Sequence, residues 1–348
     1  MIKSQSKTIL EYIWIGGKNE IRSKTKVINY FLPLNNSTYI QIPYWNYDGS
    51  STWQCDSNGD TEVILKPCAT FKDPLRVIED AVCYIVLCDT YKSNGEPTET
   101  NHRHKANIIF DTLCNESPWF GLEQEYFFSK NRNNLNYQEG EEGYHYCGTT
   151  QDANHRIISE QHLQMCIKAG IEISGINAEV AKGQWEFQIG PCEGIHVGDH
   201  LIVARYILER LAERINSFII YDPKPHPNIS GSGCHINFST NKTRNEDGID
   251  IIYKYIYQLE KNHKEHIKVY GIDNELRLTG LHETSSIDKF SWGIGTRNTS
   301  IRIPNQTANN KCGYFEDRRP ASNIDPYLAT STIFKTCCLD LKPDPNVK

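Results

Sequence analysis

The sequence predicts an α+β protein with a small, mainly β N-terminal domain and a larger mixed domain. The chain has 348 residues, which is long enough for two domains. Roughly its first 90 residues carry short apolar or alternating segments separated by polar turns. Beyond them, helical and strand patterns mix without a regular strand–helix–strand repeat, which favours α+β over a doubly wound parallel sheet.

The N-terminal domain is predicted from three strand-like segments, residues 11–15, 63–65 and 82–89. Asp73 followed by Pro74 predicts a short helix between the last two. Residues 92–99 contain Asn-Gly and a proline and are the expected linker. The sequence therefore divides into a first domain over residues 8–91 and a second over residues 98–348.

Four helices are predicted in the second domain. One covers residues 157–169 and ends at Gly170, and another is capped by Asp199 and buries the face formed by Leu201, Ala204, Leu208, Leu211 and Ile215. A third covers residues 251–270, and a fourth opens at Asp325-Pro326 and runs to the adjacent Cys337 and Cys338. The polar residues 131–142 are expected to form a surface loop.

Composition excludes several classes of function. The net charge of -6 is spread along the chain, which argues against nucleic-acid binding and against a basic membrane-binding surface. The N-terminus has no signal-peptide pattern, and the apolar runs are too short to cross a bilayer. A cytoplasmic protein is therefore expected. The 12 cysteines contain no CxxC spacing and are expected to be reduced and mostly buried, as at Cys83, Cys88 and Cys166.

Paired carboxylates on an apolar strand give the first indication of chemistry. In residues 119–128, Glu123 and Glu125 fall on one face because side chains alternate along a strand. Two desolvated carboxylates repel each other, and a cation beside them removes that cost. A solvated strand face explains this segment alone equally well.

A second acidic segment covers residues 177–189. Here Glu186 lies in an aromatic strand, and a turn at Lys182-Gly183 can bring Glu179 near it. Taken singly, this segment is better explained as a surface strand.

Two more segments carry polar residues of the same kind. His235 alternates with apolar residues in 231–239, and Glu316 lies beside two arginines in 313–320. Singly, a hydrogen-bonded core histidine and a surface ion pair explain them. Together, the four segments offer five carboxylates and one imidazole, which suit Mg²⁺ or Mn²⁺ better than zinc.

Arginines occur where a phosphate would need them. Arg302 projects from the alternating residues 300–303, Arg297 precedes it, and Arg318 follows Glu316. Arginine makes bidentate contacts to phosphate or carboxylate, although solvated charge explains any one of these residues. Neither a Walker A sequence nor GxGxxG after a strand is present, so a glycine-rich nucleotide loop does not account for phosphate binding.

Distinctive segments follow one another along the chain: WNYDGSST (45–52), WFGLEQEY (119–126), NAEV (177–180), GQWEFQIGPCEG (183–194), GCHINFST (233–240), LTGLHET (278–284), SIRIP (300–304) and GYFEDRRP (313–320). In this order they resemble the signatures of eukaryotic-type glutamine synthetases. The resemblance extends from about residue 11 to the C-terminus.

The resemblance implies a β-grasp N-terminal domain and a catalytic domain with a large curved antiparallel sheet flanked by helices. It implies a ligase that makes glutamine from glutamate and ammonium with ATP, through a γ-glutamyl phosphate and with two or more Mg²⁺ or Mn²⁺ ions per site. It also implies a homo-oligomer, a decamer of two pentameric rings, with each active site between neighbouring subunits.

The same resemblance implies roles for individual residues. The expected metal ligands are Glu125, Glu179 and Glu186 for one cation, and Glu123, His235 and Glu316 for a second. The expected ATP contacts are Tyr314, Asn237, Ser239 and Arg244.

Further roles concern glutamate and catalysis. The expected glutamate-binding residues are Arg277, Arg297, Gly231 and Ser230. The expected catalytic residues are Asp48, which comes from the neighbouring subunit and helps deprotonate ammonium, Glu283, which closes over the intermediate, and Arg302 and Arg318 near the transferred phosphate.

The sequence departs from the family pattern at two positions near the substrate. Ser230 stands where asparagine is usual, and Asn305 follows SIRIP where arginine is usual. Two alternatives stay open: a related γ-glutamyl–amine ligase, against which Asp48 and Glu283 argue, and an inactive structural homologue. The second is disfavoured because all the expected metal ligands are present.

Overall fold

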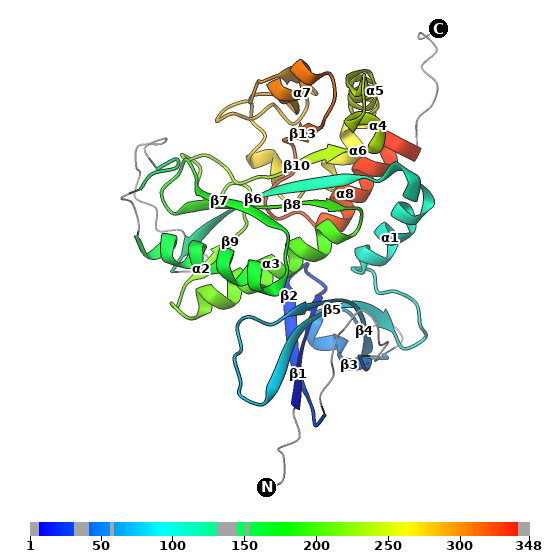
Figure 1. The fold of residues 1–348 in the computed structure, drawn as a ribbon, viewed down its shortest axis with the longest axis vertical. Coiled ribbons are helices and arrows are strands. Elements are labelled where there is room, and N and C mark those ends of the chain that lie inside the picture. The colour runs from blue at the N-terminus through cyan, green and yellow to red at the C-terminus, as the bar shows by residue number, and fades with distance from the viewer. Residues whose placement is uncertain (1–6, 31–41, 56–58, 131–144, 150–152, 340–348) are drawn as a thin grey trace.

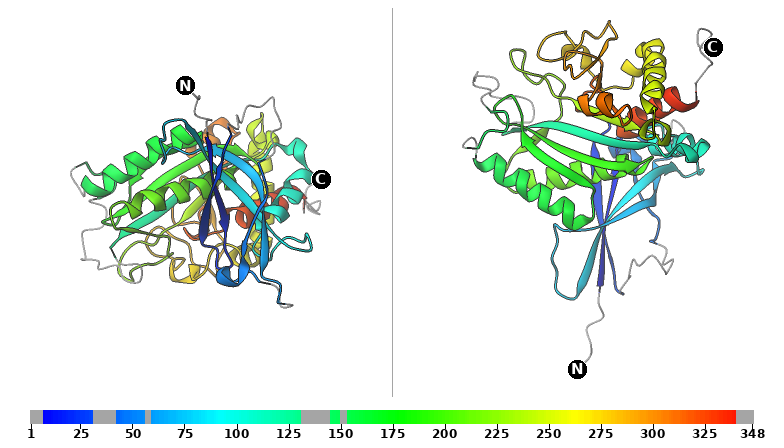
Figure 2. Two further views of the ribbon diagram at one scale, coloured as in Figure 1. Left: turned by 90° about the horizontal axis from the view of Figure 1, so that it is seen from below. Right: turned by 45° about the horizontal axis from the view of Figure 1, so that its top comes forward.

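The computed structural model describes residues 7–30, 42–55, 59–130, 145–149 and 153–339. Its strands form a five-stranded sheet and an eight-stranded sheet. In Figure 1 the five-stranded sheet, coloured blue to cyan, lies below the larger sheet, and Figure 2 shows helices on both sides of the larger one. The predicted α+β class is therefore confirmed.

The small sheet has the strand order β2-β1-β5-β4-β3, in which β1 runs parallel to β5 and the other neighbours are antiparallel. The three predicted strand segments lie inside longer strands. The strands are β1 (Lys7–Ile15), β2 (Ile21–Ile28), β3 (Trp45–Asp48), β4 (Glu62–Lys72) and β5 (Ala81–Lys92).

Side chains of β1 alternate between two apolar clusters. Leu10, Tyr12 and Trp14 pack on one face of the small sheet, and Ile13 points to the main core on the other. Both faces of this sheet are therefore covered, which is why β1 reads as nearly continuous apolar sequence.

The helix predicted at Asp73-Pro74 is wrong, because these residues form a turn after β4. The Asp73 carboxylate accepts a hydrogen bond from the Leu75 N–H at 2.9 Å and pairs with Arg76 at 2.6 Å. An Asp-Pro pair suits a turn as well as a helix start, and here no helical pattern follows it.

The large sheet carries the site. Its main path is β11-β12-β13-β10-β6-β8-β7, with β9 paired to β6. Among its described pairings, β11–β12 is parallel and the rest are antiparallel. The strands are β6 (Trp119–Ser129), β7 (Ile173–Ala178), β8 (Gln184–Glu193), β9 (Phe218–Ile220), β10 (Cys234–Ser239), β11 (Trp292–Ile294), β12 (Ile301–Ile303) and β13 (Phe315–Asp317).

Helix α3 joins the two sheets into one core. Its buried Leu201, Val203 and Leu208 belong to the same cluster as Leu87 of β5 and Phe187 of β8. The α-helices are α1 (His102–Thr112), α2 (Ala153–Ala169), α3 (His196–Glu213), α4 (Asn241–Arg244), α5 (Gly248–Lys261), α6 (His263–Ile267), α7 (Asn305–Asn310) and α8 (Pro326–Phe334).

Two of the predicted helices have the expected ends. Helix α2 ends at Ala169 and is followed by Gly170 at φ +84°. Asp325 caps α8 by accepting from the N–H groups of Tyr327 and Leu328. A π-helical turn, Lys335–Leu339, then carries the two adjacent cysteines.

The other two helix predictions need correction. Helix α3 begins at His196, so Asp199 is not its cap; the buried Asp199 carboxylate instead binds Arg103 at 2.7 Å and the Tyr327 hydroxyl at 2.8 Å. The helix predicted over 251–270 is divided into α5 and α6 at Asn262, whose backbone leaves the helical region at φ -102° and ψ 14°.

The remaining predictions concern the cysteines, membrane-spanning helices, the domain limits and one loop. Cys88 and Cys166 are buried, Cys83 is half-buried, and the described cysteines for which a state is recorded are free thiols. No helix in the described ranges is long and apolar enough to span a membrane. The domain limits 8–91 and 98–348 stay a prediction, and the loop predicted over 131–142 lies outside the described residues.

Candidate metal and phosphate site

The predicted site residues gather on adjacent strands of the large sheet. In the strand registers, Glu186 of β8 pairs with Glu125 of β6, and Glu123 of β6 pairs with His235 of β10. Across the next two ladders, Glu316 of β13 pairs with Asn237 of β10 and Arg302 of β12. Because Cβ atoms of directly paired residues lie about 4.5–5.5 Å apart, these side chains form one continuous polar face.

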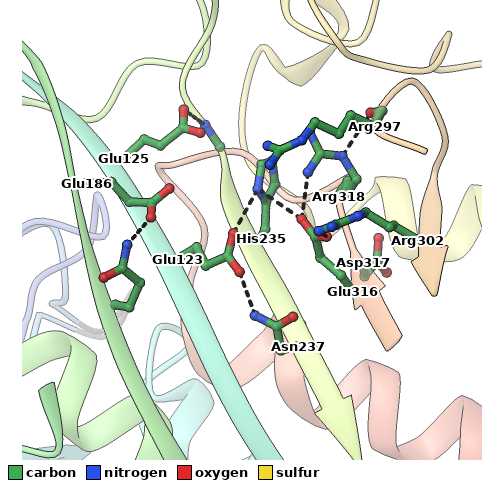
Figure 3. Close-up of polar contacts among 12 residues, drawn as sticks. Glu123, Glu125, Glu186, His235, Asn237, Arg297, Arg302, Glu316, Asp317 and Arg318 are labelled. Atoms are coloured by element: carbon green, nitrogen blue, oxygen red, sulfur yellow. Dashed lines mark hydrogen bonds and ion pairs between the residues drawn. The ribbon is translucent and has the colours of Figure 1, made fainter. Parts of the chain in front are cut away.

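Glu123, His235 and Glu316 form the tightest group on this face. One ligand atom from each lies within 4.8 Å of the others. The His235 Nδ1 atom lies 3.5 Å from a carboxylate oxygen of Glu123 and 3.5 Å from one of Glu316. Figure 3 shows the imidazole between the two carboxylates. Burial, followed by the nearby Arg318 guanidinium, holds the pKa of His235 well below its usual range, so the imidazole is neutral.

Two arginines hold Glu316 in place. Arg318 Nη1 donates to one carboxylate oxygen at 2.6 Å, and Arg302 Nη1 donates to the other at 2.9 Å (Figure 3). The Nε–H of Arg302 is buried and has no hydrogen-bond partner among the described residues. A buried donor without an acceptor is costly, and an anionic ligand would satisfy it.

Glu125, Glu179 and Glu186 occupy the other end of the face. Burial is the main cause that raises the pKa of each, to about 8 for Glu125, about 7 for Glu179 and about 9 for Glu186. The carboxylates also repel one another: Glu179 raises the pKa of Glu125, and Glu123 and Glu125 raise that of Glu186. In the described part of the chain these three do not form a cluster as tight as Glu123, His235 and Glu316.

Amide side chains orient these carboxylates, and sequence reasoning did not assign them this role. Gln184 donates from Nε2 to Glu125 at 3.1 Å, and Asn177 donates to Glu179 at 2.8 Å. Gln188 donates to Glu186. The signal was the alternation of amides with glutamates in residues 177–188, which places donors on the acidic face.

Of the predicted glutamate-binding residues, Arg277 contacts His235 directly. Arg277 is 5% exposed and donates from Nη2 to His235 Nε2 at 2.9 Å. The carbonyl of Gly231 accepts from Gln184 at 3.1 Å, and half-buried Ser230 precedes it. Arg297 is exposed, and its carbonyl accepts from Arg318 Nε at 2.9 Å.

The predicted nucleotide-binding residues fall into two groups. Asn237 donates to Glu123 at 2.8 Å. Tyr314, which is 43% exposed, lies in the loop immediately before β13. At the end of β10, Arg244 donates to the Ser239 hydroxyl at 3.0 Å. The Arg244 guanidinium also lies 4.1 Å from the ring centre of the half-exposed Trp119.

Asp48 and Glu283 are the two predicted catalytic residues that do not join the polar face. Asp48 ends β3 in the small sheet, where its exposed carboxylate accepts from the N–H and hydroxyl of Ser50 at 3.0 and 2.7 Å. These bonds hold its pKa below the usual range. Glu283 lies in an exposed loop at φ +57°, and its carbonyl accepts from Arg318 Nη2 at 3.4 Å.

The donor set fits divalent cations that prefer oxygen ligands. Glu123, His235 and Glu316 supply two carboxylates and a neutral imidazole, and Glu125, Glu179 and Glu186 supply three carboxylates. The pKa values of Glu125, Glu179 and Glu186 are raised because charged carboxylates are unfavourable when they lie buried and close together. A cation would relieve that cost.

An acidic face with an imidazole, bordered by arginines on a large and mostly antiparallel sheet, is the arrangement typical of metal-dependent enzymes that act on phosphate groups. The family model for the glutamine synthetase catalytic domain matches residues 109–251. The chain also resembles a solved glutamine synthetase of Plasmodium falciparum with a TM-score of 0.73 and 16% identity, covering 96% of this chain and 72% of that one. This structural likeness supports the fold.

Sequence relatives establish the family. The chain is 48% identical to a chloroplastic glutamine synthetase of Daucus carota, covering 96% of this chain and 78% of the relative. It is 47% identical to cytosolic glutamine synthetase isozyme 1-3 of Arabidopsis thaliana (96% and 95%) and to a glutamine synthetase of Agaricus bisporus (95% and 93%). The chain therefore belongs to the glutamine synthetase family, the glutamate–ammonia ligases.

Proposed function

We propose that this chain makes glutamine from glutamate, ammonium and ATP through a γ-glutamyl phosphate. The observation that carries the proposal is the group Glu123–His235–Glu316, with Arg302 and Arg318 bonded to the same carboxylate. Glu316 is thus both a proposed cation ligand and the partner of the two arginines that are proposed to bind phosphate. This geometry suits transfer of a phosphoryl group from ATP to a carboxylate, in which negative charges must be brought together.

Mg²⁺ or Mn²⁺ is the proposed cation, held at one position by Glu123, His235 and Glu316 and at a second by Glu125, Glu179 and Glu186. When bound, these cations would supply positive charge beside the phosphates. The chain's own arginines add to it: Arg302 offers its buried Nε–H, and Arg318 is held in place by Glu316 and two backbone carbonyls.

The substrates are proposed to bind on either side of His235. Glutamate lies near Arg277, Arg297, Gly231 and Ser230, so that its side-chain carboxylate can attack the γ-phosphorus of ATP. The nucleotide is proposed to contact Tyr314, Asn237, Ser239 and Arg244. The Trp119 ring beside Arg244 adds an aromatic surface at that end of β10.

Ammonium must lose a proton before it can attack the acyl phosphate, and Asp48 is proposed to help remove it. Its exposed position on the small sheet suits action on the site of a neighbouring subunit. Glu283, carried by a loop bonded to Arg318, is proposed to close over the intermediate and exclude water. A decamer of two pentameric rings and a cytoplasmic location are proposed with these roles.

The test is phosphate release from ATP with Mg²⁺, glutamate and ammonium, leaving out each component in turn and measuring glutamine directly. We expect release to require both glutamate and ammonium and to match the glutamine formed. Glutamate-dependent release without glutamine would indicate another amine as acceptor. No release by a properly assembled oligomer would refute the enzymatic proposal in favour of an inactive homologue.

A further inference from the structure

Arg277 is bonded to the imidazole of the candidate metal group. Its Nη2 atom donates to His235 Nε2 at 2.9 Å and to the Arg318 carbonyl at 3.1 Å, while Nη1 donates to the Arg319 carbonyl at 3.3 Å. The guanidinium is buried, and arginine keeps its charge in proteins. Arg277 is therefore a charged donor held directly against a predicted metal ligand.

This contact uses the acceptor nitrogen of His235. A neutral imidazole has one nitrogen that accepts a hydrogen bond and one that carries a hydrogen. Because Arg277 donates to Nε2, the hydrogen lies on Nδ1, which is the atom 3.5 Å from both Glu123 and Glu316. A metal ligand normally presents its lone pair to the cation and gives its other N–H to an acceptor. At His235, the group that faces Nε2 is instead a donor, the Nη2–H of Arg277.

Binding of a cation to His235 is therefore incompatible with the Arg277 contact at either ring nitrogen. If the cation takes Nε2, it occupies the lone pair to which Arg277 donates. If it takes Nδ1, the hydrogen must move to Nε2, where it faces the N–H of Arg277. Both arrangements break the 2.9 Å bond.

We infer that a divalent cation and Arg277 compete for His235, so that cation binding releases an Arg277 N–H donor for an anionic group of the substrate. The inference rests on the proposed cation site at Glu123, His235 and Glu316. Cation binding therefore favours binding of the anion by Arg277. By linkage, an anion that draws Arg277 away from His235 tightens cation binding by the same factor.

Two glycines allow the backbone to lie close against Arg277 in its contact with His235. A Cβ atom on Gly233 would lie 2.5 Å from Arg277 Nη2, and one on Gly231 would lie 2.8 Å from Arg277 Cγ. Side chains at either position would collide with Arg277 where it lies now.

Glu316 provides a contrast within the same site. Arg302 and Arg318 each donate to one of its oxygens, but a carboxylate has about four lone-pair positions and can accept these bonds and a cation together. Competition is therefore expected at Arg277 and not at Arg318. Replacing Arg318 removes the same charge near the site and serves as the matched control.

The direct test is a pair of cryo-EM structures of the full-length protein without substrates, one with Mn²⁺ and one with EDTA. We expect Mn²⁺ density at Glu123, His235 and Glu316, with Arg277 Nη2 beyond hydrogen-bonding distance of His235 Nε2. Density on all three ligands with the contact retained would overturn the competition and leave the cation site standing. No density there would overturn both the competition and the proposed site.

A binding measurement tests the same competition independently. Mn²⁺ affinity is measured by electron paramagnetic resonance for Arg277→Met and Arg318→Met, with His235→Asn defining binding at other sites. We expect Arg277→Met to bind Mn²⁺ about tenfold or more tightly than Arg318→Met, since only the first change removes a charged donor from the imidazole. Equal affinities in assembled, folded variants would refute the inference.

Discussion

Glu316 and Asp317 are adjacent on β13, yet different arginines bind their carboxylates on opposite faces of the sheet. Glu316 is bonded to Arg302 and Arg318 at the candidate site. Asp317 is 0% exposed and makes an ion pair with the fully buried Arg319 at 2.6 Å. One short strand thus carries a carboxylate of the candidate metal site on one face and a buried ion pair on the other.

Removal of Glu316 should abolish activity without unfolding the protein. Glu316→Gln retains the shape of the side chain but removes the charge that binds Arg302, Arg318 and the proposed cation. We expect glutamine formation to fall by at least about 100-fold, as when a preorganised electrostatic contact is lost. Glutamine assays, with size-exclusion chromatography to confirm assembly, check this; a near-normal rate would remove Glu316 from the site.

The buried pair behind Glu316 should govern stability. Arg319→Met leaves Asp317 charged and unpaired, and should lower the free energy of unfolding by about 3–5 kcal/mol. The double variant Asp317→Leu/Arg319→Met should recover much of this loss, since no buried charge remains. Urea unfolding of the wild type, the two single variants and the double variant measures the coupling; additive losses would contradict it.

Gln184 should act on cation binding through Glu125. Its Nε2 donates to the Glu125 carboxylate, to the Gly231 carbonyl and to the Ser232 hydroxyl. We expect Gln184→Leu to weaken Mn²⁺ binding by about 10- to 100-fold, as for other residues that orient metal ligands. The exposed Gln306 of α7 gives the control variant Gln306→Leu, and equal Mn²⁺ affinities in the two would argue against the positioning role.

The acidic face predicts a pH-dependent stability. The pKa values of Glu125, Glu179 and Glu186 are raised from 4.5 to about 8, 7 and 9. The folded protein therefore holds these protons more tightly than the unfolded chain. Their contribution to stability is fully present below the unfolded pKa and is lost as the pH rises through these folded values.

The unfolding temperature of the EDTA-treated protein should accordingly fall between about pH 5 and pH 9. Mg²⁺ should raise it more at the alkaline end, where the carboxylates are ionised. Differential scanning fluorimetry checks both trends. Glu186→Gln should flatten the pH profile, and a profile identical to that of the wild type would show that Glu186 does not titrate in this range.

Asp48 and Glu316 should act in different subunits of one site. The variants Asp48→Ala and Glu316→Ala should each be inactive. Co-assembly of the two in equal amounts should restore about a quarter of the wild-type activity. In a random mixture, about one site in four combines a subunit with intact Asp48 and a neighbour with intact Glu316. Recovery is measured after joint refolding or co-expression, and none at all would place both residues in the same subunit's site.

Local sequence pattern predicted much of the polar face. Alternation placed Glu123 with Glu125, and His235 with Asn237, on single faces of β6 and β10, and the structure has both strands. The cap at Asp325 was also predictable, since it depends on residues two and three positions away. Such features follow from backbone geometry, which a strand or helix imposes within a few residues.

The tertiary structure alone decided which of these segments meet. Asp199 was expected to cap a helix, but its carboxylate pairs with Arg103, 96 residues earlier in the chain. The bond between Arg277 and His235 likewise joins residues 42 positions apart. Local pattern sets the face on which a side chain lies, whereas its partner depends on strand order and packing, and these are determined by burial over the whole chain.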